Sequence, residues 1–190
     1  MDNGPHDEPG RMSALARPAW ARPDTMMPGS VGVDLILGRT GEVVLTVGAI
    51  RAYRNGFQFT VTGLVRAASV SDRGGMGWRV RVDVESGPLI TEFCQVGVEF
   101  SNGLSAANRH WHPPASGSVP TGLLLVALAG GGAGHRFEVD YWVWPLPPPG
   151  PVTFVCGWPT HSLAETRTAI DAGAILDAAA RCVEFWRAEP

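Results

Sequence analysis

Two histidines separated by one residue, His110 and His112 in the stretch RHWHPP, come closest to a metal site in this sequence. Imidazole nitrogens bind Zn²⁺ and other transition metals, and His135 or His161 could complete a ligand set. No Asp or Glu flanks the pair, so the spacing also fits a polar loop without a metal. We therefore expect no cofactor, and we keep a metal-dependent enzyme that uses His110 and His112 as an alternative.

The cysteines Cys94, Cys156 and Cys182 are the thiols available for nucleophilic chemistry. Cys156 alternates with apolar residues along VTFVCGW, and Cys94 does so along CQVGVEF, which predicts core thiols without activation. No G-x-S-x-G nucleophile elbow is present. The Gly-rich run 130–134 lacks the Gly-Lys-Ser/Thr ending of a phosphate-binding loop. These patterns favour a protein without catalytic residues.

Tryptophans are the main candidates for a binding surface. Trp142 and Trp144 in DYWVW fall on the same strand face as Asp140, and Trp111 could join them. Exposed tryptophans stack against sugar rings or receive a protein partner. The alternative is that a C-terminal helix covers this face. Trp111, Trp142 and Trp144 are therefore the predicted binding residues.

Composition and charge limit the partners. The chain has 15 Lys and Arg against 18 Asp and Glu, a net charge of -3. No basic block could neutralise a run of phosphates, so we expect no nucleic-acid partner. No apolar stretch reaches the ~20 residues of a membrane span, and the acidic start MDNGPHDEPG differs from a secretion signal. Because the three cysteines are widely spaced and odd in number, reduced thiols in a cytoplasmic protein fit best.

The first residues have the composition of a disordered tail. Residues 1–29 contain five prolines and little periodic apolar sequence, so they cannot bury enough surface to offset the entropy of ordering. Trp20 lies between Arg17 and Arg22, which fits a short docking motif or an incidental aromatic residue of the tail, and we favour the second. We expect one domain over 30–190, since a chain of 190 residues favours a single well-cored domain.

Short apolar runs separated by Gly, Asn and Pro fill this domain and predict antiparallel strands. Asn55-Gly56 lies between two runs, where an Asn-Gly pair favours a hairpin with a type I′ turn. Asn102-Gly103 predicts a second hairpin. The Gly-rich run 130–134 is expected to form a loose connection. The predicted strands are VGVDLIL, EVVLTVGAI, GFQFTVTGLV, WRVRVDV, ITEFCQVGVEF, GLLLVALA, HRFEVDYWVW, PVTFVCGWP and AETRTAI.

The proline run PLPPPGP after Trp144 interrupts this pattern, because proline cannot donate a hydrogen bond to a strand ladder. It contains a P-x-x-P register, which in the polyproline II conformation could dock into an SH3- or WW-like groove. No basic residue flanks the run to orient such a complex. We therefore favour a stiff crossover from one sheet to another.

The hydrophobic period changes near the C-terminus. The stretch DAGAILDAAARCVEFW predicts a helix over about 171–187, with Asp171 as N-cap. Its apolar stripe consists of Ile175, Ala178, Ala179, Cys182, Phe185 and Trp186. About nine strands and one late helix predict a mainly β fold, an antiparallel β-sandwich of immunoglobulin-like or Greek-key type with one C-terminal α-helix. A closed barrel is the alternative.

The C-terminal text from VDYWVWPLPPPGP to AAARCVEFW, together with VVLTVGAIRAYRNGFQFTV, resembles a family of uncharacterised actinobacterial proteins. Its members share a WPLPPPGP core, a following Trp-Pro and a closing alanine-rich helix. The resemblance covers most of residues 31–187. It implies that the proline run is an architectural element, and it implies no activity, cofactor or catalytic residue.

The predicted function is non-catalytic binding through an aromatic sheet face or through self-association. We expect the partner to be another protein or a second copy of this chain. A module that binds a small ligand or carbohydrate through surface tryptophans is the second hypothesis.

Overall fold

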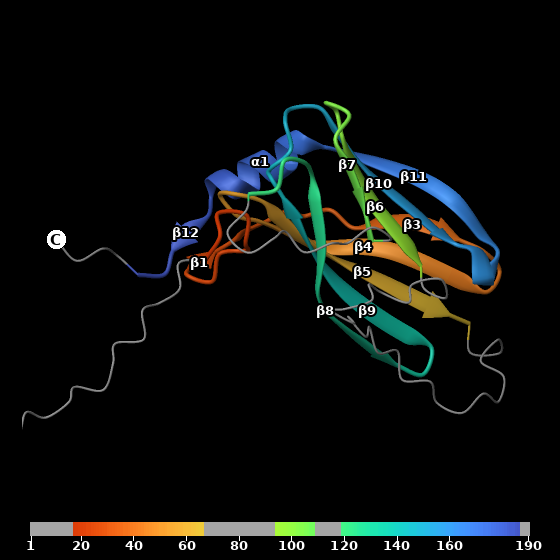
Figure 1. Ribbon diagram of the computed structural model, residues 1–190. Coiled ribbons are helices and arrows are strands. Elements are labelled where there is room, and N and C mark those ends of the chain that lie inside the picture. The colour runs from red at the N-terminus through yellow and green to blue at the C-terminus, as the bar shows by residue number, and fades with distance from the viewer. Residues whose placement is uncertain (1–16, 67–93, 109–118, 187–190) are drawn as a thin grey trace, which may run out of the picture.

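Two antiparallel sheets pack face to face in the computed structural model, which describes residues 17–66, 94–108 and 119–186 (Figure 1). The larger sheet has six strands in the order β2-β4-β5-β9-β8, with β3 also paired to β4. The smaller sheet has the order β11-β10-β6-β7, and β1 and β12 form a separate two-stranded ribbon. The predicted mainly β fold with antiparallel sheets and one helix near the C-terminus is confirmed.

The elements follow the predicted apolar runs closely. The six-stranded sheet contains β2 (Gly29–Ser30), β3 (Leu35–Arg39), β4 (Val43–Ala52), β5 (Phe57–Val65), β8 (Leu124–Ala133) and β9 (Arg136–Trp144). The four-stranded sheet contains β6 (Gln95–Phe100), β7 (Ser105–Ala107), β10 (Pro151–Trp158) and β11 (Leu163–Asp171). The remaining elements are β1 (Met26–Met27), the 3₁₀ turn η4 (Pro159–His161), α1 (Ala172–Ala180) and β12 (Val183–Glu184). The predicted strand WRVRVDV lies outside the described residues.

Alternating side chains build one apolar core between the two sheets. Phe59 of β5 meets Phe154 of β10 edge to face, with 5.1 Å between the ring centroids. Phe137 of β9 meets Trp158 of β10 in the same way at 5.3 Å. Burying a side chain of this size contributes roughly 1.5–3 kcal/mol, so these cross-sheet pairs hold the two layers together.

The two Asn-Gly pairs form hairpins of different kinds. Asn102-Gly103 turns the chain between β6 and β7, and Gly103 has φ +85°, a conformation that favours glycine. Asn55-Gly56 ends a four-residue loop between β4 and β5 that is closed by the bond from Tyr53 N to Gly56 O. Neither Asn55 nor Gly56 has a positive φ. The prediction of a type I′ turn at Asn55-Gly56 is therefore wrong, although the hairpin exists.

The proline run connects the two sheets, as predicted. β9 ends in the six-stranded sheet at Trp144, the Trp144–Pro145 peptide bond is cis, and β10 begins in the four-stranded sheet at Pro151. Ser101 Oγ donates a hydrogen bond of 2.9 Å to Pro149 O, which ties the crossover to the β6–β7 hairpin.

The C-terminal helix is shorter than predicted. α1 begins after Asp171, whose side chain accepts a hydrogen bond from Gly173 N, and ends at Ala180 instead of continuing to 187. The reason is tertiary: β1 offers backbone partners to Val183 and Glu184, so the chain leaves the helix to pair there. α1 packs against β2 and β4. No helix in the described ranges is long and apolar enough to cross a membrane.

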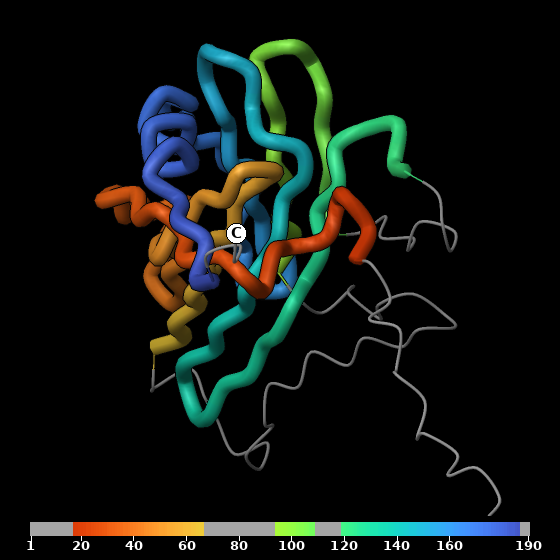
Figure 2. Tube along the Cα trace, turned by 90° about the vertical axis from the view of Figure 1, so that its left-hand side faces the viewer, coloured from red at the N-terminus to blue at the C-terminus, as the bar shows by residue number. Residues whose placement is uncertain are grey.

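The N-terminal segment is ordered further than predicted. Residues 17–29 pack on the sandwich, where β1 pairs with β12 and β2 pairs with β4. We refer to residues 17–27 as the strap, and Figure 2 shows it in red crossing in front of the teal strands β8 and β9. The prediction of a disordered tail therefore fails for 17–29, because this segment finds backbone and side-chain partners in the domain. Residues 1–16 lie outside the described residues.

The Gly-rich run is also more regular than expected. Gly130–Gly132 and Ala133 continue β8 in register with β9, and only Gly134 (φ +60°) and His135 form the turn. A Cβ on Gly132 would come within 2.4 Å of Arg136 O, so the glycine permits a close approach of the two strands. The prediction of a loose connection over 130–134 is wrong for most of the run.

Candidate functional site

The predicted tryptophan face is closed in the structure. Trp142 lies on the outer side of the six-stranded sheet, yet it is only 1% exposed. Trp144 is half-buried beside it, and Trp111 lies outside the described residues. The hypothesis of an open binding face at Trp142 is therefore wrong, and so is the expectation that the C-terminal helix covers it. The strap and the residues that follow α1 cover it instead.

An aromatic pocket surrounds the Trp142 indole. Tyr53 meets it edge to face at 5.6 Å between ring centroids, and Met26 and Cys182 complete a small buried cluster. Gly56 lies directly against the ring, since a Cβ on this residue would come within 2.7 Å of an indole carbon and 2.3 Å of Val143 O. The β4–β5 hairpin and β9 thus shape the pocket around one tryptophan.

Polar side chains in this region bind the backbone of the strap. Trp142 Nε1 donates a hydrogen bond of 2.8 Å to Trp20 O. Asn55 Nδ2 donates to Ala19 O at 2.8 Å and to Ala21 O at 2.9 Å. Three successive carbonyl groups of the strap are therefore satisfied by donors from β9 and from the β4–β5 hairpin.

One side chain of the strap adds a further polar contact. Arg22 Nη1 donates a hydrogen bond of 2.6 Å to Oε1 of Gln58, which is almost fully buried on the outer face of β5. Gln58 is the cross-strand partner of Trp142. Gln58 of β5 and Trp142 of β9 thus contact the strap from directly paired positions on adjacent strands.

An exposed apolar surface lies on the ribbon formed by β1 and β12. Its members, which we name the terminal patch, are Met27 (52% exposed), Val183 (51%), Phe185 (54%) and Trp186 (76%). Met27 and Val183 are directly paired across the ribbon, and Phe185 N donates to Thr25 O at 2.8 Å. Pairing along the ribbon therefore brings residues from both ends of the described chain into one surface.

The histidines do not form a metal site in the described part of the chain. His110 and His112 lie outside the described residues, and His135 is exposed at the β8–β9 turn. The imidazole of His161 contacts the Trp158 ring at 4.2 Å, and partial burial lowers its pKa while Glu42 opposes the shift. Within the described ranges, no three His, Cys, Asp or Glu side chains come together as metal ligands do.

The thiols are buried, as predicted for Cys94 and Cys156. Burial raises the pKa of Cys94 to about 12, and the nearby Cys156 adds to the shift. Burial also raises the pKa of Cys156, whose Sγ lies 3.1 Å from Thr166 Oγ1. Because the thiolate is the nucleophilic form, neither residue is activated in this environment.

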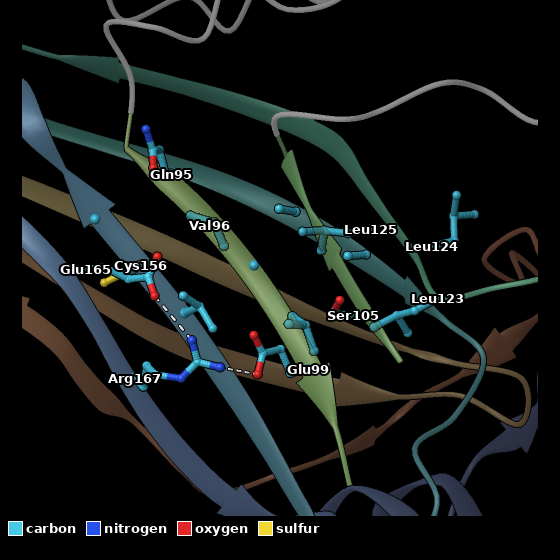
Figure 3. A pocket seen from close by; sticks show the side chains of 16 residues that line it. Gln95, Val96, Glu99, Ser105, Leu123, Leu124, Leu125, Cys156, Glu165 and Arg167 are labelled. Atoms are coloured by element: carbon cyan, nitrogen blue, oxygen red, sulfur yellow. Dashed lines mark hydrogen bonds and ion pairs between the residues drawn. The ribbon is translucent and has the colours of Figure 1, made fainter. Parts of the chain in front are cut away.

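A shallow groove of about 450 Å³ runs along β6, β7 and β10 of the four-stranded sheet and reaches residues 123–125 at the start of β8 (Figure 3). Gly97 and Gly157 lie among its lining residues, and Arg167 bridges Glu99 and Glu165 along its side. No aromatic side chain lines it among the described residues. The sequence analysis missed this groove, because residues of β6 and β10 such as Gly97 and Val155 become neighbours only through strand pairing.

A second hollow lies on the outer face of the six-stranded sheet. It encloses about 480 Å³, and its acidic side chains are Asp34, Glu138 and Asp140. Asp140 accepts a hydrogen bond of 2.6 Å from Thr60 Oγ1, and Thr62 Oγ1 lies 3.4 Å from Glu138. The acidic side chains of β9 are therefore engaged by threonines on the next strand.

No family model matches the chain, and neither a curated protein nor a solved structure matches it.

Proposed function

We propose that this protein is a non-catalytic binding protein that associates with a second copy of itself through the terminal patch. The observation that carries the proposal is a set of four large apolar side chains, each more than half exposed. Two lie on one short ribbon, and the other two directly follow it: Met27 and Val183, then Phe185 and Trp186. Soluble monomers rarely expose a contiguous apolar surface of more than a few hundred Å². A surface of this kind is typical of protein interfaces.

The size of the terminal patch supports a weak dimer. Aromatic side chains present roughly 150–250 Å² each, and Met and Val present somewhat less. The four side chains, which are 51–76% exposed, therefore offer on the order of 500 Å² per copy. Two copies would then bury about 1,000 Å², which is near the lower limit for a specific interface. Phe and Trp are also the residue types that dominate binding energy at interfaces. We expect a dissociation constant of roughly 1–100 μM.

Sedimentation velocity of the full chain over a range of concentrations tests this proposal. We expect a monomer–dimer equilibrium that Trp186→Ser weakens at least ~10-fold, because an aromatic anchor at an interface contributes about 2 kcal/mol or more. Ile36→Ser is the matched control, since Ile36 is 56% exposed on β3 and lies outside the patch. A strict monomer at about 1 mM, or a dimer that is equally weakened by both substitutions, contradicts the proposal. If the chain proves to be a strict monomer, the remaining hypothesis is that the partner is a different protein.

Binding of a small ligand in the groove beside Arg167 is a second candidate. Its volume of about 450 Å³ falls within the range of small-molecule sites, roughly 300–1,000 Å³. Neither Trp142 nor Trp144 lines it, so recognition by the described residues would rest on Gln95, Glu99, Glu165 and Arg167. A panel of sugars and small amines that leaves the melting temperature unchanged contradicts this candidate. A shift that Arg167→Ala removes supports it.

A further inference from the structure

The strap is held in the manner of a bound peptide. Its carbonyl groups at residues 19, 20 and 21 accept hydrogen bonds from Asn55 and Trp142. Residues 18–21 form a turn that the bond from Ala21 N to Pro18 O closes, and the carbonyls of residues 19–21 point to side-chain donors outside it. Recognition of proline-containing peptides uses side-chain donors and aromatic surfaces in a comparable way. The hairpin and β9 therefore recognise main-chain atoms of the strap, which any polypeptide in the same conformation carries.

The side chains of the strap add selectivity. Arg22 reaches the buried Gln58 at 2.6 Å, and Met26 packs against Trp142 and Cys182. Pro18 and Pro23 flank the recognised stretch and restrict its conformation, which lowers the entropy lost on binding. The sequence that fits is thus a Pro-Ala-Trp-Ala-Arg-Pro segment with a turn at its start and a methionine three residues after its end.

The strap also has hydrogen bonds and an ion pair between its own residues. Arg17 forms an ion pair of 2.9 Å with Asp24 and donates to Arg22 O at 3.2 Å. Ala21 N donates to Pro18 O at 2.9 Å. The segment therefore carries bonds of its own that a separate peptide of the same sequence also contains.

The groove is likewise built without the strap. The Tyr53–Trp142 contact, the close fit of Gly56 under the indole and the bond from Tyr53 N to Gly56 O all lie within the β4–β5 hairpin and β9. Asn55 Oδ1 is buried without a partner in the described part of the chain, so this groove retains an acceptor that the strap does not use. Groove and segment are therefore two separately formed surfaces.

We propose that Tyr53, Asn55, Gln58 and Trp142 form a peptide-binding groove, and that the strap is its ligand in cis. The groove accepts the same class of ligand in trans, a proline-flanked peptide with this turn and an arginine, when the strap is displaced. None of the four groove residues belongs to the terminal patch, although Met27 at the end of the strap does. The inference does not rest on self-association. A tethered segment competes at an effective concentration of about 1 mM, so the native chain binds such a peptide only weakly.

A labelled peptide with the sequence of residues 17–28, RPAWARPDTMMP, tests the inference by fluorescence anisotropy. The acceptor is the full chain in which residues 17–24 are replaced by Gly and Ser. We expect saturable binding that is at least ~10-fold tighter than to the native chain, no binding of a scrambled peptide, and a loss of roughly 10-fold on adding Asn55→Ala. A replaced chain that melts cooperatively but fails to bind the peptide, or binds the scrambled one equally, overturns the inference.

A milder variant covers the case in which the replaced chain does not fold. Arg22→Ala in the otherwise native chain removes the bond to Gln58 and weakens the strap, so the peptide should bind this variant more tightly than the native chain. Arg39→Ala is the matched control, because Arg39 is an exposed arginine of β3 away from the strap. Equal peptide binding by the native, Arg22→Ala and Arg39→Ala chains overturns the inference. The dimer measured by sedimentation is a separate readout, so either proposal can fail alone.

Discussion

The aromatic cluster around Trp142 and the terminal patch contain adjacent residues of the chain, Met26 and Met27. The cluster is buried, whereas the patch is exposed to solvent. Met26 of β1 packs into the cluster and is 7% exposed, whereas Met27 belongs to the patch and is 52% exposed. Successive residues of a strand point to opposite sides, so the ribbon has one face toward the sandwich and one toward solvent. The inward side packs on the cluster around Trp142, and no described segment covers the outward side.

The difference between these two regions shows what closes an aromatic surface. The Trp142 indole has an apolar ring packed on Tyr53 and an N–H bonded to Trp20 O. Burial of an aromatic group with a polar atom is favourable only when that atom finds a partner. The strap supplies Trp20 O for the N–H and Met26 for the buried cluster, so the cluster is part of the fold, whereas the patch stays exposed.

The largest difference in stability is expected between variants that lack Trp142 of the cluster and Trp186 of the patch. Trp142→Ala is expected to lower the free energy of unfolding by about 3–5 kcal/mol, because it leaves a cavity beneath the strap. Trp186→Ala should change it by less than about 0.5 kcal/mol, since its side chain is largely exposed. Urea denaturation of both variants measures these values. Similar losses in the two variants would mean that the regions do not differ as described.

Filling the space under the Trp142 indole should have a smaller effect. Gly56→Ala places a methyl group 2.3 Å from Val143 O, a backbone atom that cannot move without disturbing β9. We expect a loss of about 1–3 kcal/mol by thermal or urea unfolding. Gly41→Ala is the control, because a Cβ there meets nothing within 4 Å. An unchanged Gly56→Ala variant would show that the indole is not packed on this residue.

Removing the donors that hold the strap should cost less still. Asn55→Ala deletes two hydrogen bonds to strap carbonyls, and we expect a loss of about 1–2 kcal/mol together with faster hydrogen exchange in the strap. Asn55→Asp has nearly the same size but no amide donor, so it should lose at least as much. If Asn55→Asp keeps the native stability, packing rather than donation holds the strap.

The smallest effect is expected in thiol labelling. Cys182 lies beneath the strap with its Sγ 3.9 Å from Met26 Sδ, whereas Cys94 lies in the core between the sheets. In the Arg22→Ala chain, Cys182 should react several-fold faster with a thiol reagent, while the rate for Cys94 should not change. Equal acceleration at both cysteines would indicate global unfolding instead of local opening of the strap.

Much of the fold was predictable because it rests on local patterns. The alternation of Phe57, Phe59 and Val61, the turn at Gly103 and the break at Pro145 each reflect chemistry within a few residues. The failures have one cause in common. The helix ends at Ala180 and the strap is ordered because residues more than 150 positions apart, such as Met26 and Glu184, pair along the ribbon.

The candidate site was predicted only in part for the same reason. The aromatic character of Trp142 was visible in the sequence, but the bond that covers it comes from Trp20, 122 positions away. The position of Trp20 between Arg17 and Arg22 was the available signal for this contact, since a docking motif was one of its two interpretations. The exposure of Phe185 and Trp186 could not be predicted from a helical stripe that included both.

Fluorine NMR of the chain labelled with 5-fluorotryptophan tests the central claim most directly. The chain has seven tryptophans, and Trp142→Phe and Trp186→Phe assign the two resonances of interest. We expect the Trp186 resonance to shift as the protein concentration rises through the dimer range, while the Trp142 resonance stays fixed under the strap. A Trp186 resonance that is independent of concentration, or a Trp142 resonance that moves in its place, would contradict an open patch beside a closed cluster.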